Sequence, residues 1–444
     1  MGLTLEAFHT LCQEHGVHTV EVATPDTYGH LRGKRVPVDR FFASGHSSAF
    51  GIADAIFVMD MQNDLPDNEF INMDSGFLDC HLHADVSTGR ILTHRPGYAL
   101  VFADAFDSDG EPHPLSPRAI LKKQIAKCTA MHLDPVVATE LEFYLCNADW
   151  SPVQSHIQYS SLTDALELED VFADMRSALI GAGMDVESSN AEYGAGQIEI
   201  NVAYNDALTT ADDTVLFRSI VKQVAVQHGM RATFMPKPWM DQSGSGMHVH
   251  TSLKSDGANV FASSSGGPNE TMAKWLAGLL KHAPALGLLG APTANGPRRI
   301  DPYTFAPTHI HWGLDNRTVL ARCIAEAGSP ANRVEFRAGG ADANPYLFIA
   351  GLLAAGTDGI TNDLDPGPMS EGDMYTNPGD CIPLANSLAG SIEAYSGSEL
   401  AVQLGDIFSA SYVSMAAAEV VLAAEHGVAG DVNDWERARY IEFS

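Results

Sequence analysis

Short segments in which apolar residues alternate with ionisable ones constrain the fold of this chain more than any other feature. Residues 135–146 contain Thr-Glu-Leu-Glu-Phe-Tyr, residues 196–202 contain Gln-Ile-Glu-Ile-Asn, and residues 332–338 contain Arg-Val-Glu-Phe-Arg. A Gly/Ser loop leads into a fourth segment at residues 243–252, Ser-Gly-Ser-Gly-Met-His-Val-His-Thr-Ser. Successive side chains of a strand point to opposite faces, so each segment predicts a strand with one apolar and one polar face. The polar faces carry Glu140, Glu142, Tyr144, Gln197, Glu199, Asn201, His248, His250, Ser252, Arg333, Glu335 and Arg337.

These polar faces have two interpretations. A sheet with one solvated side also alternates in this way, and a histidine on a strand is commonly a surface or structural residue. Here the polar faces are rich in Glu, His and Arg and almost free of Lys, Thr and Ser. Clustered carboxylates repel one another unless cations bind between them. We therefore predict a concave antiparallel sheet whose inner face holds divalent cations. Carboxylates outnumber imidazoles and no thiolate is nearby, which favours Mg²⁺ or Mn²⁺ over zinc.

Arginines are concentrated in one part of a chain that has few cations. The six between residues 298 and 337 are Arg298, Arg299, Arg317, Arg322, Arg333 and Arg337. Arginine binds phosphate and carboxylate oxygens with two parallel hydrogen bonds. Together with metals and a glycine-lined approach, these arginines indicate ATP-dependent phosphoryl or acyl-phosphate chemistry. The sequence contains neither a Walker A motif nor the set of protein-kinase motifs, so we exclude the usual ATP-binding folds.

Composition narrows the class of protein. The formal net charge of −30 argues against nucleic-acid or anionic-membrane binding, which need a basic surface. The N-terminus has no signal-peptide pattern, and the apolar stretch at residues 345–360 is too short to span a bilayer. The six cysteines lack CxxC spacing and are expected to be reduced thiols. We therefore expect a cytoplasmic protein that binds no membrane.

The chain is expected to form two domains. Residues 1–108 predict a small, β-rich N-terminal domain, residues 107–114 a linker, and residues 114–444 a larger domain of alternating strands and helices. Ser116-Pro-Arg predicts a helix that begins at Pro117 and ends near His132. The elements expected in the N-terminal domain are a helix at 3–15, strands at 17–22, 56–61 and 99–103, and a hairpin at 24–35.

Five ordered motifs resemble the glutamine synthetase family across nearly the whole chain. They are residues 138–145, 192–199, 244–250, 315–322, and 333–337 followed by Ala-Asn-Pro-Tyr at 343–346. The resemblance implies an α+β fold, with a β-grasp-like N-terminal domain and a catalytic domain built on a curved antiparallel sheet with flanking helices. It also implies a homododecamer of two hexameric rings, in which neighbouring subunits share each active site.

The resemblance also implies roles for individual residues. One metal would be held by Glu142, Glu192 and Glu199, and a second by Glu140, His248 and Glu335. The family's ATP-contacting positions match Glu187, His250, Ser252, Arg317 and Arg322. Its glutamate-contacting positions match Gly244, Arg299 and Arg337. The residues implied in catalysis are Arg317, Glu335 and Arg337.

The implied reaction has two steps. ATP phosphorylates the side-chain carboxylate of glutamate while metals and arginines stabilise the transferring group. An amine then attacks the γ-glutamyl phosphate and displaces phosphate.

Three departures from the family concern the amine. Phe305, in Pro-Tyr-Thr-Phe-Ala-Pro at 302–307, stands where ammonia-using members carry a flap glutamate. The N-terminal loop that supplies an aspartate for ammonium is replaced by residues 50–59, in which Asp54 is at best a displaced substitute. Ser243 replaces an asparagine before the Gly-Ser-Gly run. The phosphate-side lysine of the family is absent as well, because residues 329–333 form a shorter run.

Replacing a carboxylate by Phe removes a base and a charge and adds apolar surface, which suits an amine that carries carbon. We therefore predict a γ-glutamyl–amine ligase. Two alternatives are a glutamine synthetase that uses ammonia, with Phe305 as a packing residue, and a non-catalytic structural member of the fold. Tyr375 lies where some bacterial members are adenylylated, but the surrounding sequence differs and we interpret it as structural.

Overall fold

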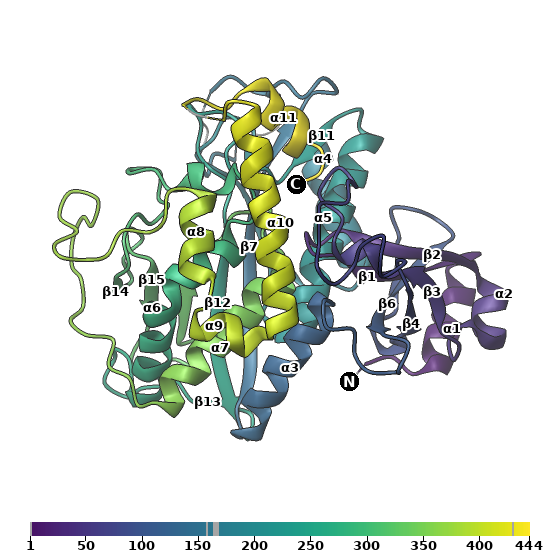
Figure 1. Ribbon diagram of the computed structural model, residues 1–444, viewed down its shortest axis with the longest axis horizontal. Helices are drawn as coiled ribbons and strands as arrows, with labels where there is room; N and C mark the ends of the chain where they lie inside the picture. The colour runs from purple at the N-terminus through teal and green to yellow at the C-terminus, as the bar shows by residue number, and fades with distance from the viewer. Residues whose placement is uncertain (1, 157–158, 163–167, 429) are drawn as a thin grey trace.

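The computed structural model describes residues 2–156, 159–162, 168–428 and 430–444. Within these residues the chain forms two separate β-sheets, one from the first 106 residues and a larger one from the remainder. Figure 1 shows the N-terminal sheet, with α1 and α2, at one end of the molecule beside the larger part that the helices cover. This arrangement is the α+β fold that the sequence predicts.

The N-terminal sheet has the strand order β2-β1-β6-β4-β3, and β5 pairs with β6. The predicted hairpin is present, and its turn places Gly29 at φ +82°, a conformation that favours glycine. The sheet is mixed, because β1 runs parallel to β6. Its elements are α1 (Leu5–Glu14), β1 (Thr19–Pro25), β2 (Leu31–Pro37), α2 (Val38–Arg40), β3 (Phe50–Ala53), β4 (Asp79–Ala84), β5 (Arg90–Ile91) and β6 (Tyr98–Phe106).

The prediction of a strand at residues 56–61 is wrong. The strand in this region is β3, and the chain then turns through a short 3-10 helix at Asp54–Phe57. Ile56, Phe57 and Val58 are buried, so the apolar run belongs to the core although it is not extended. A short apolar run suits a buried strand and a buried helical turn equally well, and only packing distinguishes them.

The larger sheet has the order β14-β15-β16-β12-β7-β9-β8, with β10 and β11 paired to β7 and β13 paired to β12. All of its strand pairs are antiparallel except β14 and β15, which corrects the prediction of a wholly antiparallel sheet. The reason is the loop at residues 315–320, which returns the chain to the start of β14, where Ala321 N donates to His311 O. The strands are β7 (Asp134–Cys146), β8 (Val186–Ala191), β9 (Gln197–Val202), β10 (Asn205–Asp206), β11 (Arg231–Thr233), β12 (Met247–Ser255), β13 (Ala258–Asn259), β14 (Trp312–Leu314), β15 (Ala321–Ile324) and β16 (Arg333–Phe336).

Helices cover the apolar face of this sheet. α3 and α5 contact β7, α6 contacts β15 and β16, and the almost fully buried α7 packs against α3, α5 and α6. α3 begins as predicted, because the Ser116 side chain accepts from Ala119 N and Pro117 occupies the first position. The helices are α3 (Pro117–Ala130), α4 (Glu169–Gly181), α5 (Ala207–Gln227), α6 (Glu270–Gly290), α7 (Pro345–Thr361), α8 (Leu388–Tyr395), α9 (Glu399–Leu404), α10 (Asp406–Glu425) and α11 (Asp434–Tyr440).

A buried arginine joins the two parts of the molecule. The Arg118 side chain, on α3, is fully buried and pairs with Asp104 of β6, with Asp85 at 3.0 Å and with Asp212 of α5 at 3.1 Å. Tyr346 of α7 donates to the same Asp212 at 2.5 Å. The N-terminal sheet is therefore tied to the helices beneath the larger sheet through one cation and three carboxylates.

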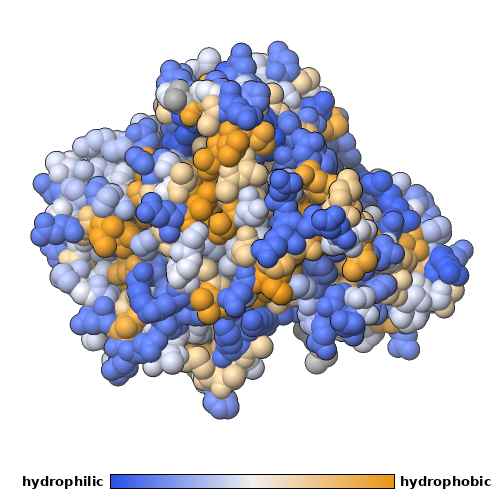
Figure 2. Space-filling model, viewed as in Figure 1, coloured by the Kyte–Doolittle hydropathy of each residue, from blue (hydrophilic) through white to orange (hydrophobic). Residues whose placement is uncertain are grey.

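Among the described residues, α10 is the one helix long and apolar enough to cross a membrane by length and composition. Its Phe408, Tyr412 and Met415 are buried in the core, and its Glu419 pairs with Arg439 at 2.6 Å. Figure 2 shows hydrophobic residues gathered along the middle of the face on which α10 lies in Figure 1. Such contacts are those of a packed helix, and a core helix meets the same length and composition criteria.

Candidate active site

The polar faces of β7 and β12 meet at a carboxylate and two histidines. The antiparallel register places His248 opposite Glu140. Nδ1 of His248 lies 3.3 Å from Oε2 of Glu140, and Nε2 of His250 lies 2.9 Å from Oε1 of the same carboxylate. Burial raises the pKa of Glu140, but the two histidines outweigh burial and hold that pKa well below its usual range. Glu140 is therefore an anion that faces two imidazoles.

Glu335 of β16 completes this cluster from the other side of β12. Its fully buried carboxylate accepts from Arg322 Nη1 at 2.9 Å and from Arg337 Nη1, and it lies 3.5 Å from Nδ1 of His248. Burial raises the pKa of Glu335, but the charges of Arg337 and the two histidines together outweigh burial and keep this pKa low. Glu140, His250 and Glu335 each place one potential ligand atom within 4.8 Å of the others. The structure thus brings together the predicted Glu140, His248 and Glu335, and adds His250 to them.

A second group consists of carboxylates alone. Glu142 of β7 lies opposite Glu199 of β9, and Glu192 follows the end of β8, which pairs with β9. Burial, and then the charges of Glu142, Glu140 and Glu192, raise the pKa of Glu199 to about 9. Burial and Glu142 likewise raise the pKa of Glu192. Like charges held this close disfavour ionisation, and a divalent cation between them removes the conflict. Glu142, Glu192 and Glu199 are the three residues predicted to share one metal.

Arg299 reaches the first cluster through a channel that two glycines leave open. Its buried guanidinium contacts Nε2 of His248 at 3.2 Å and donates to the Arg337 carbonyl at 3.1 Å. A Cβ atom added to Gly244 would lie 2.7 Å from Cγ of Arg299, and one added to Gly246 would lie 2.5 Å from Nη2. The Gly-Ser-Gly run is therefore required by the path of an arginine as well as by the approach of a ligand.

The tautomer of His248 follows from this contact. A guanidinium only donates hydrogen bonds, so Nε2 of His248 accepts from Arg299 and the proton lies on Nδ1. That proton points at the carboxylates of Glu140 and Glu335. The imidazole is therefore oriented by Arg299. To ligate an ion through Nδ1 it would have to give up this proton, and Nε2 would then carry the proton and no longer accept from Arg299.

Several predicted ATP contacts line one cavity of about 240 Å³. Glu187 of β8, His250 and Ser252 of β12 and Arg333 of β16 contribute to its wall, together with Glu140 at its inner end. The Arg333 guanidinium donates from Nε to Nδ1 of His250 at 3.0 Å. The cavity thus places cationic and hydroxyl groups beside the anionic cluster.

The other two predicted ATP contacts lie outside this cavity wall. Arg322 of β15 bonds Asp315 and Glu335 and is partly buried. Arg317 lies in the exposed loop after β14, and it makes no hydrogen bond or ion pair with any of the residues that the structure describes. Its charge opposes the rise in the pKa of Glu192 that burial and Glu142 cause.

A loop contacts Arg337 through its main chain. Arg337 Nη2 donates to the Phe305 carbonyl at 3.1 Å, while the Phe305 side chain is 51% exposed. Tyr303 and Phe305 have φ values of +66° and +59°, which are strained for aromatic residues and often accompany a binding role. We name residues 302–305 the flap loop. Its backbone contacts the site and its apolar side chain remains accessible.

Two predicted amine-side residues lie elsewhere. The Ser243 carbonyl accepts from the Tyr144 hydroxyl at 2.7 Å, so this residue orients the loop before β12. Asp54 lies in the N-terminal part of the chain, in the 3-10 helix after β3, and it belongs to none of the clusters or cavity walls described above. Asp54 is 8% exposed, and its Oδ1 has no hydrogen-bond partner among the described residues.

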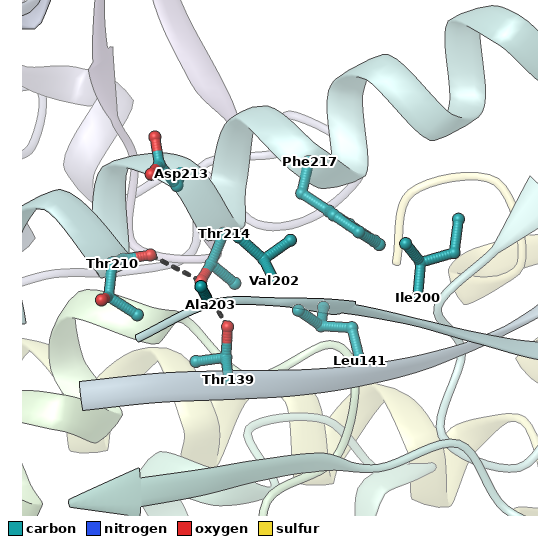
Figure 3. Close-up of a pocket in the computed structure, with 9 residues that line it drawn as sticks. All are labelled: Thr139, Leu141, Ile200, Val202, Ala203, Thr210, Asp213, Thr214 and Phe217. Carbon is teal, nitrogen blue, oxygen red and sulfur yellow. Dashed lines mark hydrogen bonds between the residues drawn. The ribbon is translucent and has the colours of Figure 1, made fainter. Parts of the chain in front are cut away.

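A cavity of about 20 Å³ lies on the opposite, apolar face of the sheet, beneath α5 (Figure 3). Leu141, Ile200 and Phe217 point into it, and Thr139 and Thr214 share a hydrogen bond of 2.8 Å at its edge. Such a volume holds about one water molecule. It is a packing gap and not a substrate site.

Gln197 is a positioning residue whose role we did not anticipate. It is buried, donates from Nε2 to Gly244 O at 3.0 Å and to Ser245 Oγ at 3.1 Å, and accepts from Gly194 N at 2.9 Å. It therefore joins the loop after Glu192 to the glycine run that Arg299 crosses. Its place on the polar face of residues 196–202 is a signal that could have identified it.

Comparison with known proteins agrees with this geometry. Residues 114–440 match the glutamine synthetase catalytic domain. The chain is 36% identical over 447 residues to a glutamate–isopropylamine ligase of Pseudomonas sp, covering 97% of this chain and 96% of that protein. It is 33% identical over 456 residues to the gamma-glutamylethanolamide synthetase of Streptomyces coelicolor, covering 99% and 96%. The solved structure of GmaS without ligand matches with a TM-score of 0.84 at 30% identity, covering 97% of this chain and 98% of that chain.

The chain belongs to the glutamine synthetase family, and it is a ligase of that family. Within the family it is similar over nearly its whole length to proteins named as ligases of glutamate and organic amines. The resemblance stated from the sequence motifs is confirmed.

Proposed function

We propose that this protein is an ATP-dependent ligase that phosphorylates the γ-carboxylate of glutamate and couples it to a primary amine larger than ammonia. The products are a γ-glutamylamide, ADP and phosphate. The observation that carries the proposal is the placement of two buried arginines, Arg299 and Arg337, between an anionic cluster and an exposed aromatic side chain, Phe305. Similarity to the isopropylamine and ethanolamide enzymes supports the same reaction.

The anionic clusters suit divalent cations, and we propose Mg²⁺ or Mn²⁺ there. Glu142, Glu192 and Glu199 would hold one ion, and Glu140, His248 and Glu335, with His250 beside them, would hold another. The raised pKa values of Glu199 and Glu192 support this assignment, because these carboxylates are crowded without a cation. Bound there, the ions would neutralise phosphate charge and act as Lewis acids on the transferring group.

Residues of the chain orient the two substrates of the first step. The cavity with Glu187, His250, Ser252 and Arg333 has hydroxyl and cationic groups for a nucleotide. Arg299 and Arg337 are preorganised donors for carboxylate oxygens, because both are buried and held by backbone contacts. Arg317 and Arg322 would stabilise charge on the phosphoryl group, and Arg317 has a free guanidinium within the described residues with which to do so.

The amine side is apolar where ammonia-using members are acidic. Phe305 offers exposed aromatic surface above Arg337, which favours an amine with an attached carbon chain. Asp54 belongs to no cluster or cavity wall of the site in its own chain, and we propose that it acts across a subunit boundary. Its buried Oδ1, without a partner among the described residues, fits a role that a neighbouring subunit completes.

We further propose the domain limits 1–108 and 114–444, a cytoplasmic location and a homododecamer of two hexameric rings. Exposed apolar side chains on α9 and α10, namely Val402, Ile407 and Val421, are suited to contact another subunit. All six cysteines are free thiols, as a reducing compartment favours.

Phosphate release with ATP, glutamate and a panel of amines tests the proposed reaction. The panel contains ammonium, methylamine, isopropylamine, ethanolamine and putrescine at equal concentrations. We expect saturable phosphate release that requires glutamate and is fastest with an organic amine, together with the corresponding γ-glutamylamide by mass spectrometry. Turnover with ammonium alone would establish a glutamine synthetase instead. Absence of turnover with every amine, in protein that binds ATP, would favour the non-catalytic alternative.

A further inference from the structure

The loop that carries Tyr375 contacts the flap loop and the segment after β14, where Met374 N donates to Thr318 Oγ1 at 3.2 Å. Asp373 accepts from Tyr375 N at 2.9 Å and from the Thr376 hydroxyl at 2.6 Å. The Tyr303 hydroxyl lies 3.1 Å from Thr376 Oγ1, and the rings of Tyr303 and Tyr375 lie 5.3 Å apart at 53°. The bonds of Asp373 orient the backbone at Tyr375, and Tyr303 contacts its ring. These two contacts set the position of the Tyr375 ring.

The Tyr375 hydroxyl is buried and has no hydrogen-bond partner among the residues that the structure describes. Two other buried tyrosines of the chain are bonded: the Tyr395 hydroxyl lies 2.9 Å from Ser409 Oγ, and Tyr412 donates to the Leu288 carbonyl at 3.3 Å. An unsatisfied buried hydroxyl destabilises the fold, so such groups usually have a ligand or water partner. The unpaired state of Tyr375 therefore calls for a partner that is not part of the protein.

The flap loop connects Tyr375 to the two arginines. The Tyr375 ring contacts Tyr303, and two residues further on the Phe305 carbonyl accepts from Arg337 Nη2 at 3.1 Å. Arg299 in turn donates to the Arg337 carbonyl at 3.1 Å. Burial raises the pKa of Tyr375, and the charges of Arg337 and Arg299 oppose that effect. Nε of Arg337 is also buried and without a partner among the described residues. Two donors without a partner among the described residues therefore belong to groups that the flap loop connects. Donors without acceptors form a site for an anionic oxygen.

We propose that the Tyr375 hydroxyl is a substrate-binding group that donates a hydrogen bond to a carboxylate oxygen of glutamate held by Arg299 and Arg337. This assignment rests on the proposed function and adds a residue that we interpreted from the sequence as structural. Tyr303 positions Tyr375 through the ring contact and the Thr376 bond, so the flap loop and the glutamate site are mechanically connected. Binding of glutamate would then satisfy both unpaired donors at once.

The variant Tyr375→Phe tests the proposal, because it removes the hydroxyl and keeps the ring. We expect the KM for glutamate to rise about 10- to 100-fold, as for loss of a hydrogen bond to a charged group, while the KM for ATP stays unchanged. The melting temperature of the glutamate-free protein should be unchanged or slightly higher, since an unsatisfied polar group is removed. An unchanged KM for glutamate, or a fall in kcat alone, would overturn the assignment.

Tyr412→Phe is the matched control, because Tyr412 is a buried tyrosine of α10 whose hydroxyl is bonded within the core. It should lower the melting temperature and leave the KM for glutamate unchanged, which is the opposite pair of effects. Wild-type phosphate release with glutamate is measured beside both variants. If the wild type shows no turnover, the proposed function fails. If the wild type turns over and Tyr375→Phe has the wild-type KM for glutamate, only the proposed role of Tyr375 fails.

Discussion

The guanidinium of Arg337 and the backbone carbonyl of Phe305 lie 3.1 Å apart, so the flap loop is attached to the site by its main chain. The same arginine bonds Glu335, and Glu335 lies beside His248. A side chain on the flap loop can therefore change without breaking the contact that positions the loop. This separation allows the flap side chain to set the amine preference while the phosphate-side machinery is kept.

Phe305→Glu should shift acceptor preference toward ammonium. The new carboxylate adds a charge that attracts a small cation and a base that accepts its proton, and it removes apolar contact with an organic amine. We expect the ratio of kcat/KM for ammonium to that for the best organic amine to rise at least about tenfold. Phe305→Leu, which remains apolar, should leave the ratio near that of the wild type. Equal ratios for the Glu and Leu variants would show that residue 305 does not line the amine site.

Gly246→Ala should greatly reduce activity, because its Cβ would lie 2.5 Å from Nη2 of Arg299. Displacing this guanidinium would change the orientation of His248 and the glutamate contact that we propose for Arg299. A displacement of about 1 Å in such a site costs roughly 100-fold in kcat/KM. Gly287→Ala of α6 is the control, since its Cβ would meet only Ser391 Oγ at 3.6 Å, and its activity should be that of the wild type. Wild-type kcat/KM in Gly246→Ala would contradict the proposed path of Arg299.

Glu199→Gln should keep or raise the melting temperature of the protein without metal and abolish the increase that added metal causes. The variant removes one charge from a crowded, buried set of carboxylates, so the metal-free protein should melt at the same temperature as the wild type or higher. The increase in melting temperature on adding Mg²⁺ or Mn²⁺ should be lost, because a ligand is lost. Thermal melts without nucleotide measure both effects. The exposed Glu393→Gln of α8 should respond to metal as the wild type does; an equal metal response in Glu199→Gln would exclude this residue as a ligand.

His113 should make folding stability depend on pH in the mildly acidic range. Burial lowers the pKa of this histidine to about 4, against the opposing charge of Asp107. Its ring stacks on Phe57, and Nδ1 accepts from Leu115 N at 3.3 Å, which requires the neutral form. The unfolded chain binds the proton near pH 6.5 and the folded protein only near pH 4. Neutral, buried His113 therefore makes its full contribution to the free energy of unfolding above pH 6.5. This contribution, up to about 3 kcal/mol, is lost as the pH falls toward 4.

His113→Asn keeps an acceptor and removes the titration, so its unfolding free energy should change less between pH 7 and pH 4.5 than that of the wild type. Denaturant melts at both pH values measure the difference. The exposed His132→Asn should keep the wild-type dependence. If the unfolding free energies of the His113 variant and the wild type change equally between pH 7 and pH 4.5, groups other than His113 cause the acid sensitivity.

Arg118→Met should destabilise the protein by about 3–5 kcal/mol, because it leaves the buried Asp212 with only Tyr346 as a partner. The double variant Arg118→Met with Asp212→Asn should recover part of this loss, since no buried charge is then unpaired. Chemical denaturation gives both values. If Arg118→Met alone is as stable as the wild type, the ion pairs of Arg118 do not stabilise the packing of the N-terminal sheet on α3 and α5.

Local patterns predicted the strands of the larger sheet well, and they selected candidate site residues whose roles stay predictions. The alternation in residues 135–146 correctly indicated β7, and the Ser116-Pro117 signal correctly indicated the start of α3. The same kind of reasoning was wrong for residues 56–61, because a short apolar run does not encode whether it is extended. It also missed the parallel pairing of β14 and β15, because pairing direction depends on where the intervening loop leads the chain.

The amino-acid sequence by itself determined which residues are chemically able to form this site: carboxylates and histidines in alternation, arginines within forty residues, and glycines where a bulky side chain would clash. It could do so because side-chain direction in a strand follows from a two-residue period. Only the tertiary structure decided that Glu142 faces Glu199, that Arg299 crosses Gly246, and that the Tyr375 hydroxyl is buried without a partner among the described residues. These are contacts between segments far apart in the chain, and they depend on strand order, register and loop path, which no local pattern contains.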